Sequence, residues 1–318
     1  MKFVLKALAV LLIVAAISAA AVLFYADSKY HALRAAREAS FSEVADESVS
    51  MVLVMKPALA EALILEKASA LSENIRPWMI NFALPYEAAL LMRPDLANKR
   101  LDTTMFLNER RFGPMIVQQA NAYGMGAVMP QVQWAPDGFV QKERGVITVD
   151  GSLPINPAIA ALAEQKWGIV TPAGYPEPEG GHLAELIVDN RNGGLFLLLG
   201  TLQSSGIVSM NLPPDELATN LLPVGIFRLN ADLVSPEVAN ITLRIEAAIN
   251  ATEGEFGAFD FTLSLLYGAL AKGLRDNGGI ELEGSKKREG TVITGQYTLT
   301  GVSKLFEPPQ PQGMARPN

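Results

Sequence analysis

The pattern of apolar and polar positions begins with one continuous apolar stretch, residues 7–26, in which Ser18 and Tyr25 are the only interruptions. Twenty helical residues rise about 30 Å, which is the thickness of the hydrocarbon layer of a bilayer. Lys2 and Lys6 precede the stretch and favour a cytoplasmic N-terminus. We therefore expect a single transmembrane signal anchor, with the rest of the chain outside the cytoplasm.

A cleaved signal peptide is the competing interpretation of this N-terminus. The tripeptides Ser18-Ala19-Ala20 and Ala19-Ala20-Ala21 both have the small residues that a signal peptidase requires. The apolar stretch nevertheless continues to Phe24, beyond the roughly 7–15 apolar residues of a typical signal peptide. We expect a cytoplasmic N-terminus at 1–6 and an anchor at 7–26 in the inner (cytoplasmic) membrane of a bacterium. A helical membrane-proximal linker is expected at 27–46. The lipid bilayer is then a partner of the chain through residues 7–26.

Two-residue and 3.6-residue periodicities alternate over the next part of the chain. Residues 47–56 place apolar side chains at every second position, which predicts a strand. Pro57 suits a first helical turn, and the apolar stripe that follows it reaches Ile75, before Pro77. Two extended runs and a further helix come next, at 85–93, 100–107 and 108–122.

The same order of patterns recurs in the last third of the chain. Residues 241–249 alternate apolar and polar side chains and predict a half-buried strand. Phe259 begins a helical stripe of four turns, which ends at the glycine C-cap Asn277-Gly278-Gly279. The segments 280–284 and 291–299 then predict a hairpin across a polar turn.

These patterns predict an α+β fold, in which a transmembrane helix precedes a mixed or antiparallel sheet packed with helices. At both ends of the exported part the predicted order of elements is β-α-β-β, so we interpret the two ends as pseudo-duplicated units. We expect a first β-α-β-β-α unit at 47–128 and an insertion rich in Pro and Gly at 129–182. A hairpin with the second unit follows at 183–307, and a disordered tail at 308–318.

The segment 129–182 differs from its neighbours, because it holds seven prolines and two of the three tryptophans. Asn156 and Pro157 mark the N-cap and the first position of a short helix. A second hairpin is expected just beyond, with strands 183–189 and 195–202.

Composition narrows the classes of function. The chain has a net charge of −7, although its first 40 residues hold more Lys and Arg than Asp and Glu. An acidic body without a cluster of basic and aromatic residues repels phosphate backbones, which argues against a nucleic-acid partner. The chain has no Cys, which removes disulfides, thiolate metal sites and Cys nucleophiles. It also has no phosphate-binding or dinucleotide-binding glycine loop, so we expect no cofactor.

His182 is the only histidine beyond the membrane-proximal linker. Glu179, Glu185 and Asp189 lie near it in the sequence, and an imidazole with three carboxylates is a donor set for a divalent metal or a metal-dependent hydrolase. Zinc sites usually take more nitrogen or sulfur ligands than one His supplies, and an acidic Pro/Gly-rich run is also typical of a solvated loop. We expect no metal here, and the hydrolase remains the alternative function.

Four aromatic residues of the insertion are the candidate surface for a partner or a ligand: Trp134, Phe139, Trp167 and Tyr175. Aromatic side chains in a proline-stiffened segment suit a recognition surface or the lid of an apolar groove. They equally suit the cap of a core beneath a long loop.

From these observations we expect a non-enzymatic, membrane-anchored protein of the bacterial envelope. Its periplasmic domain would bind a protein partner or an apolar ligand, or serve a structural role. A lipid-handling protein is the third interpretation, and it requires an open apolar cleft between the two β-α-β-β units.

Overall fold

The computed structural model of the chain describes residues 45–46, 48–61, 63–65, 85, 87–108, 133–142, 146–168, 177–204 and 213–306. The predicted anchor 7–26 and the predicted tail 308–318 lie outside these residues, and so does the helix 108–122 apart from its first residue. Within the described ranges, no helix is both long and apolar enough to cross a membrane.

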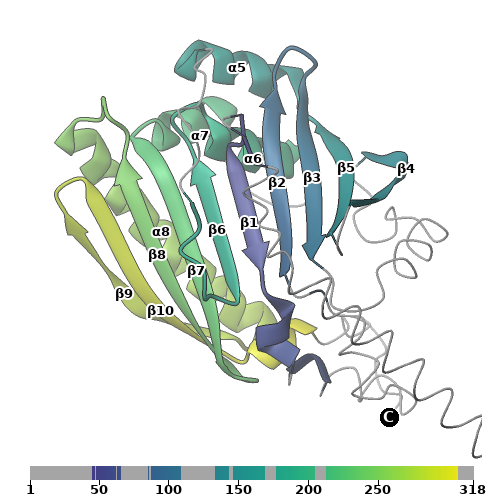
Figure 1. Cartoon of the computed structure of the whole chain (residues 1–318). Helices are drawn as coiled ribbons and strands as arrows, with labels where there is room; N and C mark the ends of the chain where they lie inside the picture. Colours follow the sequence, from purple (N-terminus) through teal and green to yellow (C-terminus); the bar gives the residue numbers. More distant parts are fainter. Residues whose placement is uncertain are drawn as a thin grey trace, which may run out of the picture.

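One antiparallel sheet organises the described part of the chain (Figure 1). Its ten strands follow the order β4-β5-β3-β2-β1-β6-β7-β8-β10-β9, and every neighbouring pair is antiparallel. The strands are β1 (Met51–Met55), β2 (Glu87–Asp95), β3 (Arg100–Asn108), β4 (Gln133–Lys142), β5 (Val146–Pro154), β6 (Ala184–Asp189), β7 (Val224–Ser235), β8 (Val238–Ala247), β9 (Glu281–Glu289) and β10 (Val292–Thr300). The central strand β1 joins the two halves, because Val52 lies opposite both Leu91 of β2 and Ile187 of β6.

This topology shows that the predicted fold class is wrong. The sheet is continuous and antiparallel, and it is not built from two copies of one unit. In the N-terminal part the first strand pairs with the second, β1 with β2. In the C-terminal part β8 pairs with β10, the last strand of its group, and β9 lies at the edge. The order of elements along the chain is alike in the two parts, but strand partners depend on contacts that no local pattern encodes.

The longer helices cover one face of the sheet, whereas two short helices, η2 and η4, follow the ends of β1 and β10 (Figure 1). The helices are η2 (Pro57–Ala60), α5 (Pro157–Trp167), α6 (Gly194–Ser204), α7 (Pro214–Leu221), α8 (Glu253–Gly278) and η4 (Val302–Phe306). α5, α6 and α7 contact one another, and α8 lies along β9. The main core contains the fully buried side chains of Phe196, Ile245, Phe256 and Ile293.

The strand expected at 195–202 is instead the helix α6. An apolar run of this length has no periodicity that separates a buried strand from a buried helix. Asn190 stabilises the helix start, because its side-chain Oδ1 accepts the backbone N–H groups of Leu195 and Phe196. The helix then packs against α5 and α7.

Capping and turn residues elsewhere in the sequence predicted the correct secondary structure. Asn156 caps α5 by accepting the N–H of Ala158, and Pro157 is the first residue of that helix. Gly279 ends α8 in the left-handed conformation, with φ of 59°. The last hairpin is confirmed with a shift, because β9 continues through the predicted turn to Glu289. β7 was not predicted at all, and the segment 129–182 contains β4, β5 and α5.

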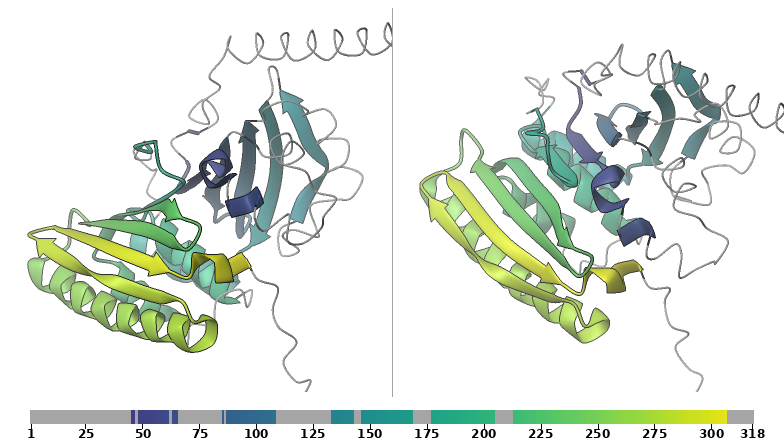
Figure 2. Two further views of the ribbon diagram at one scale, coloured as in Figure 1. Left: turned by 90° about the horizontal axis from the view of Figure 1, so that it is seen from below. Right: turned by 60° about the horizontal axis from the view of Figure 1, so that its bottom comes forward.

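The opposite face of the sheet changes character along its width. Around β1 to β3 it is apolar, and Val52, Leu91 and Phe106 are buried there. Over β7, β8, β10 and β9 the residues of this face are polar, as the exposed Thr242 and Gln296 illustrate. Figure 2 shows α8 beneath these strands and no described helix on their other side. We call this second region the polar face.

Candidate functional site

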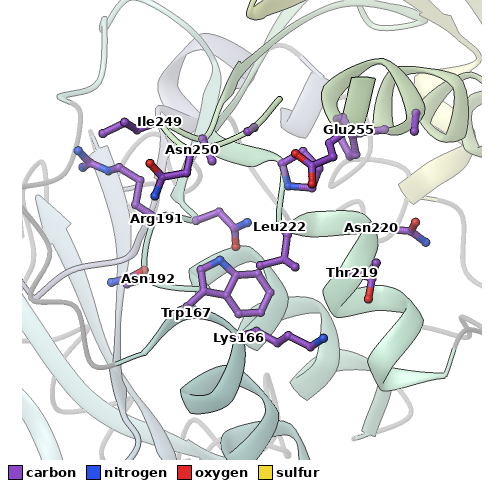
Figure 3. A pocket seen from close by; sticks show the side chains of 16 residues that line it. Lys166, Trp167, Arg191, Asn192, Thr219, Asn220, Leu222, Ile249, Asn250 and Glu255 are labelled. Atoms are coloured by element: carbon purple, nitrogen blue, oxygen red, sulfur yellow. The ribbon is translucent and has the colours of Figure 1, made fainter. Parts of the chain in front are cut away.

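A cavity of about 710 Å³ opens at one end of the sheet, where strand ends meet helix ends (Figure 3). Its walls come from the end of α5, the turn after β6, the end of α7, the loop from β8 to α8, and the first turns of α8. Cavities of this size are typical of sites for small organic ligands. We call it the end pocket and identify it by Trp167, Arg191, Leu222, Ile249, Glu255 and Phe259.

Trp167 provides a broad aromatic surface in the end pocket (Figure 3). It is the last residue of α5, and its ring stacks on Phe196 of α6 with the ring centroids 5.2 Å apart. Leu222 and the buried Phe259 extend the apolar wall. Ile249, in the loop after β8, is 90% exposed at the same pocket. A bound apolar group would therefore remove unusually exposed apolar surface from water.

The turn after β6 is fixed by the buried side chain of Asn190. Its Nδ2 donates to the carbonyl oxygens of Leu221 and Val224, at 2.8 Å and 3.0 Å. Its Oδ1 accepts the two N–H groups at the start of α6. One side chain thus joins the turn, α6 and the end of α7, and it holds this wall of the pocket in place.

Arg191 places its guanidinium at the pocket, and the neighbouring carboxylate of Asp189 neutralises the charge of this group. Its Nε lies 2.9 Å from Oδ1 of Asp189, whose side chain is fully buried. Hydrogen bonds from Arg191 to this carboxylate raise the pKa of the guanidinium. The charge of Arg191 is therefore balanced inside the wall.

The start of α8 carries a reciprocal cap. Thr252 Oγ1 accepts the N–H of Glu255, and the Glu255 carboxylate accepts the N–H of Thr252 at 2.8 Å. The hydrogen bond from the Thr252 backbone N–H, followed by that from its hydroxyl, lowers the pKa of Glu255 below its ordinary value. Because both groups are engaged in the cap, this side of the pocket is already set before a ligand arrives.

Lys166 is the cation of the pocket that has no counter-ion within the described part of the chain. It is exposed in the last turn of α5, next to Trp167 (Figure 3). The end pocket therefore combines an apolar wall with a cation, Lys166, and a carboxylate, Glu255, at different places on its edge, and this combination suits binding of an amphipathic molecule.

Of the four predicted metal ligands, the structure brings His182 and Glu179 close together. Nδ1 of His182 lies 2.7 Å from Oδ2 of Asp232 on β7, and Nε2 lies 4.0 Å from Oε2 of Glu179. Glu185 instead accepts a hydrogen bond from Arg228 at 3.0 Å and two backbone N–H groups of the preceding loop. Asp232 and Arg228 lie on β7, a strand that no sequence pattern predicted, so neither residue was a candidate before the fold was known.

Asp189 lies apart from the other predicted metal ligands. It is four residues from Glu185 along β6, about 13 Å away, and it is paired with Arg191. Among the described residues, no group of three His, Asp or Glu side chains could hold a metal ion. The four residues of the hydrolase hypothesis therefore do not converge on one point.

The four predicted aromatic residues also separate. Trp167 lines the end pocket. Trp134 and Phe139 belong to β4, at the far edge of the sheet, and Tyr175 lies outside the described residues. Leu222 was missed, because a residue just beyond a helix end leaves no periodic signal in the sequence. Ile249 was predicted as the last residue of the half-buried strand 241–249, but β8 ends at Ala247 and Ile249 lies exposed in the following loop.

Comparisons with known proteins add little. No family model and no curated protein matches the chain. Among solved structures, the chain is similar to crystal form I of TP0453, with a TM-score of 0.38 and 12% identity, over 85% of this chain and 96% of that chain. A likeness at this level carries no argument about function.

Proposed function

We propose that this protein is a non-enzymatic binding protein of the bacterial envelope, and that its end pocket holds a small amphipathic ligand. The observation that carries the proposal is the end pocket itself. A cavity of about 710 Å³ has an indole and aliphatic side chains on its walls and an isoleucine that is 90% exposed beside it.

The polar groups suggest how the ligand is oriented. Its apolar body would lie against Trp167, Leu222 and Phe259, and its polar or anionic end would face Lys166. The pocket lies between helix ends at one end of the sheet, and not between two repeated units as the lipid-handling interpretation required.

The location in the envelope is part of the proposal. Residues 7–26 have the length and apolar character of a single membrane span. Retained as an anchor, they would tether the folded domain to the outer side of the inner membrane. Digestion of the domain by protease added to spheroplasts, but not to intact cells with a sealed outer membrane, tests this placement.

Photo-crosslinking in living bacteria tests the pocket. The full chain is expressed with p-benzoylphenylalanine at Ile249, which is exposed at the pocket, or at Val234, which is 62% exposed elsewhere. We expect light to attach a small molecule to the chain labelled at Ile249 and not to the chain labelled at Val234. The mass of the labelled peptide reports the adduct.

Two matched substitutions show whether the adduct depends on the cavity. Ala258→Trp fills the end pocket, whereas Ala161→Trp adds the same side chain at an exposed position of α5 outside it. The adduct at position 249 should disappear in the first variant and persist in the second. A protein adduct, equal labelling at both positions, or labelling that survives Ala258→Trp would overturn the proposal.

A further inference from the structure

The end pocket is lined by one cation and one anion whose charges are not balanced by any partner within the described part of the chain. Of the charged residues on its walls, Arg191 is already paired with Asp189. Lys166 is exposed in the last turn of α5 and makes no ion pair among the described residues. Glu255, in the first turn of α8, likewise has no cation beside it there. One positive and one negative charge therefore remain for a ligand.

One carboxylate oxygen of Glu255 is available to a ligand. The backbone N–H and the hydroxyl group of Thr252 both donate to Oε2 of Glu255. Its Oε1 accepts no hydrogen bond from any described residue. The two hydrogen bonds from Thr252 lower the pKa of Glu255, so the carboxylate is ionised at neutral pH. A ligand ammonium group can thus bind to Oε1 while the helix cap stays intact.

The two unbalanced charges lie on different walls of the pocket. Lys166 and Glu255 lie on opposite sides of Leu222 in Figure 3. The dipole of each helix end opposes the charge beside it with only about half an elementary charge, so both charges keep their sign. The matching ligand has an anionic and a cationic group, with an apolar part between them.

Two primary amides also line the end pocket. Asn220 is half-buried near the end of α7, and Asn250 is exposed in the loop after β8. Neither side chain makes a hydrogen bond within the described ranges. A primary amide both donates and accepts, which matches the N–H and C=O groups of a peptide and has no counterpart in a hydrocarbon chain.

The volume of the pocket limits the length of the ligand. At roughly 30 Å³ per non-hydrogen atom, the share of one molecule in liquid water, the cavity of about 710 Å³ holds about 24 atoms, or about three leucine residues. Two Cα spacings of about 3.8 Å put the ends of such a tripeptide roughly 7 Å apart. A single amino acid carries both charges on one carbon atom, and therefore cannot place them against two walls.

We propose that the ligand of the end pocket is a short apolar peptide with free termini. This inference rests on the proposed function, because it names the class of small amphipathic ligand. The terminal ammonium group binds to Glu255, and the terminal carboxylate binds to Lys166. The apolar side chains lie against Trp167, Leu222 and Phe259.

Calorimetric titration of the full chain in phosphatidylcholine nanodiscs tests the proposal, with empty nanodiscs as the background. The probes are trileucine, N-acetyl-trileucine, trileucine amide, triserine and ω-aminooctanoate. We expect trileucine to bind, and each blocked peptide to bind roughly threefold more weakly because it lacks one charged end. A blocked peptide with the affinity of trileucine would contradict the role of that end. Equal affinity of triserine would contradict the apolar wall, and equal affinity of ω-aminooctanoate would contradict a peptide ligand.

The two tryptophan variants locate this binding in the molecule. Ala258→Trp fills the end pocket, and it should abolish the binding of trileucine. Ala161→Trp, at an exposed position of α5 outside the pocket, should preserve it. Trileucine binding that survives Ala258→Trp would show that the peptide binds elsewhere.

Glu255→Gln tests the contact with the ligand ammonium group. Glutamine at this position also accepts the N–H of Thr252, so the helix cap is kept. The variant should bind trileucine roughly threefold more weakly and bind N-acetyl-trileucine as the parent does. Glu253→Gln, at an exposed position outside the pocket, should change neither affinity. If acetylation weakens binding to the Glu255→Gln variant as much as to the parent, Glu255 does not bind the ammonium group.

Lys166→Gln tests the other end of the ligand in the same way. The variant should lose roughly threefold in affinity for trileucine and nothing for trileucine amide, which has no carboxylate. Lys272→Gln, at an exposed position of α8 outside the pocket, is the control and should leave both affinities unchanged. Equal losses for trileucine in the two variants would show a general effect of charge and no contact with Lys166.

Crosslinking at Ile249 distinguishes failure of this inference from failure of the proposed function. An adduct with the mass of a short peptide would support both. An adduct with the mass of a lipid would leave the small-ligand pocket standing and would rule out the peptide. No adduct at Ile249, together with no binding of trileucine, would remove both.

Discussion

Individual buried polar residues fix the turns that shape this protein. Asn190 is fully buried, and four backbone groups from three segments bind to its side chain. Glu185 plays a related part on the other face, because it holds the preceding loop through two N–H groups and pairs with Arg228. In both cases the side chain replaces hydrogen bonds that the local backbone lacks.

Asn190→Ala tests the first of these residues. The substitution leaves two carbonyl oxygens and two N–H groups without their partner in a dry site, so we expect a loss of about 2–4 kcal/mol in the free energy of unfolding. Equilibrium urea unfolding followed by near-ultraviolet circular dichroism measures it. The exposed Asn250 is the control, and Asn250→Ala should change stability by less than about 0.5 kcal/mol. A cost below about 1 kcal/mol for Asn190→Ala would contradict this account.

At the scale of elements, α8 shows how the same residue type can have opposite effects on stability. Gly279 ends the helix with φ of 59°, a conformation that is strained for a residue with a Cβ. Gly268 lies within the helix, is exposed, and has no atom within 4 Å of an added Cβ. The first glycine is required by the backbone, and the second only weakens the helix.

Replacing each glycine by alanine should therefore change stability in opposite directions. Gly279→Ala should cost about 1 kcal/mol, whereas Gly268→Ala should add roughly 0.5–1 kcal/mol. Thermal unfolding of the two variants beside the parent protein measures both effects. Changes of the same sign would show that the helix end does not depend on its left-handed cap.

The composition of the edge strand β9 opposes pairing with a strand of another molecule. Six of its nine residues are charged: Glu281, Glu283, Lys286, Lys287, Arg288 and Glu289. Charged side chains on an edge strand discourage the addition of a strand from another molecule. Assembly through this edge is therefore disfavoured.

At the scale of the whole molecule, one short central strand, β1, joins the two halves of the sheet. β1 pairs on both sides, and its contact with β6 joins Val52 to Ile187, which is distant in the sequence. Residues of β1 and β6 are also among the most deeply buried of the described residues. Opening this pair requires the two halves of the sheet to separate.

Hydrogen exchange should reveal this organisation. The amides of β1 and β6 should exchange only through global unfolding, whereas those of β9 should exchange at least about tenfold faster through local opening. Mass spectrometry of peptides from the labelled full chain resolves the two groups. Equal rates in β1 and β9 would mean that the sheet opens as one unit and that β1 has no special role.

Signals confined to a few neighbouring residues predicted the local structure well. The sequence by itself determined the start of α5 at Asn156 and Pro157, the end of α8 at Gly279, and the alternation of β8, because caps and periodicity act within one or two turns. It also gave the expectation of a membrane anchor at 7–26, which is set by composition alone.

Only the tertiary structure decided which elements meet. It made 195–202 a helix, paired β8 with β10, and brought Trp167, Leu222 and Ile249 to one pocket from three separate segments. It likewise placed Asn230 opposite Thr242 and Arg228 opposite Arg244. These results depend on strand register and long-range packing, which sum contributions from residues far apart in the chain and leave no periodic trace in any one segment.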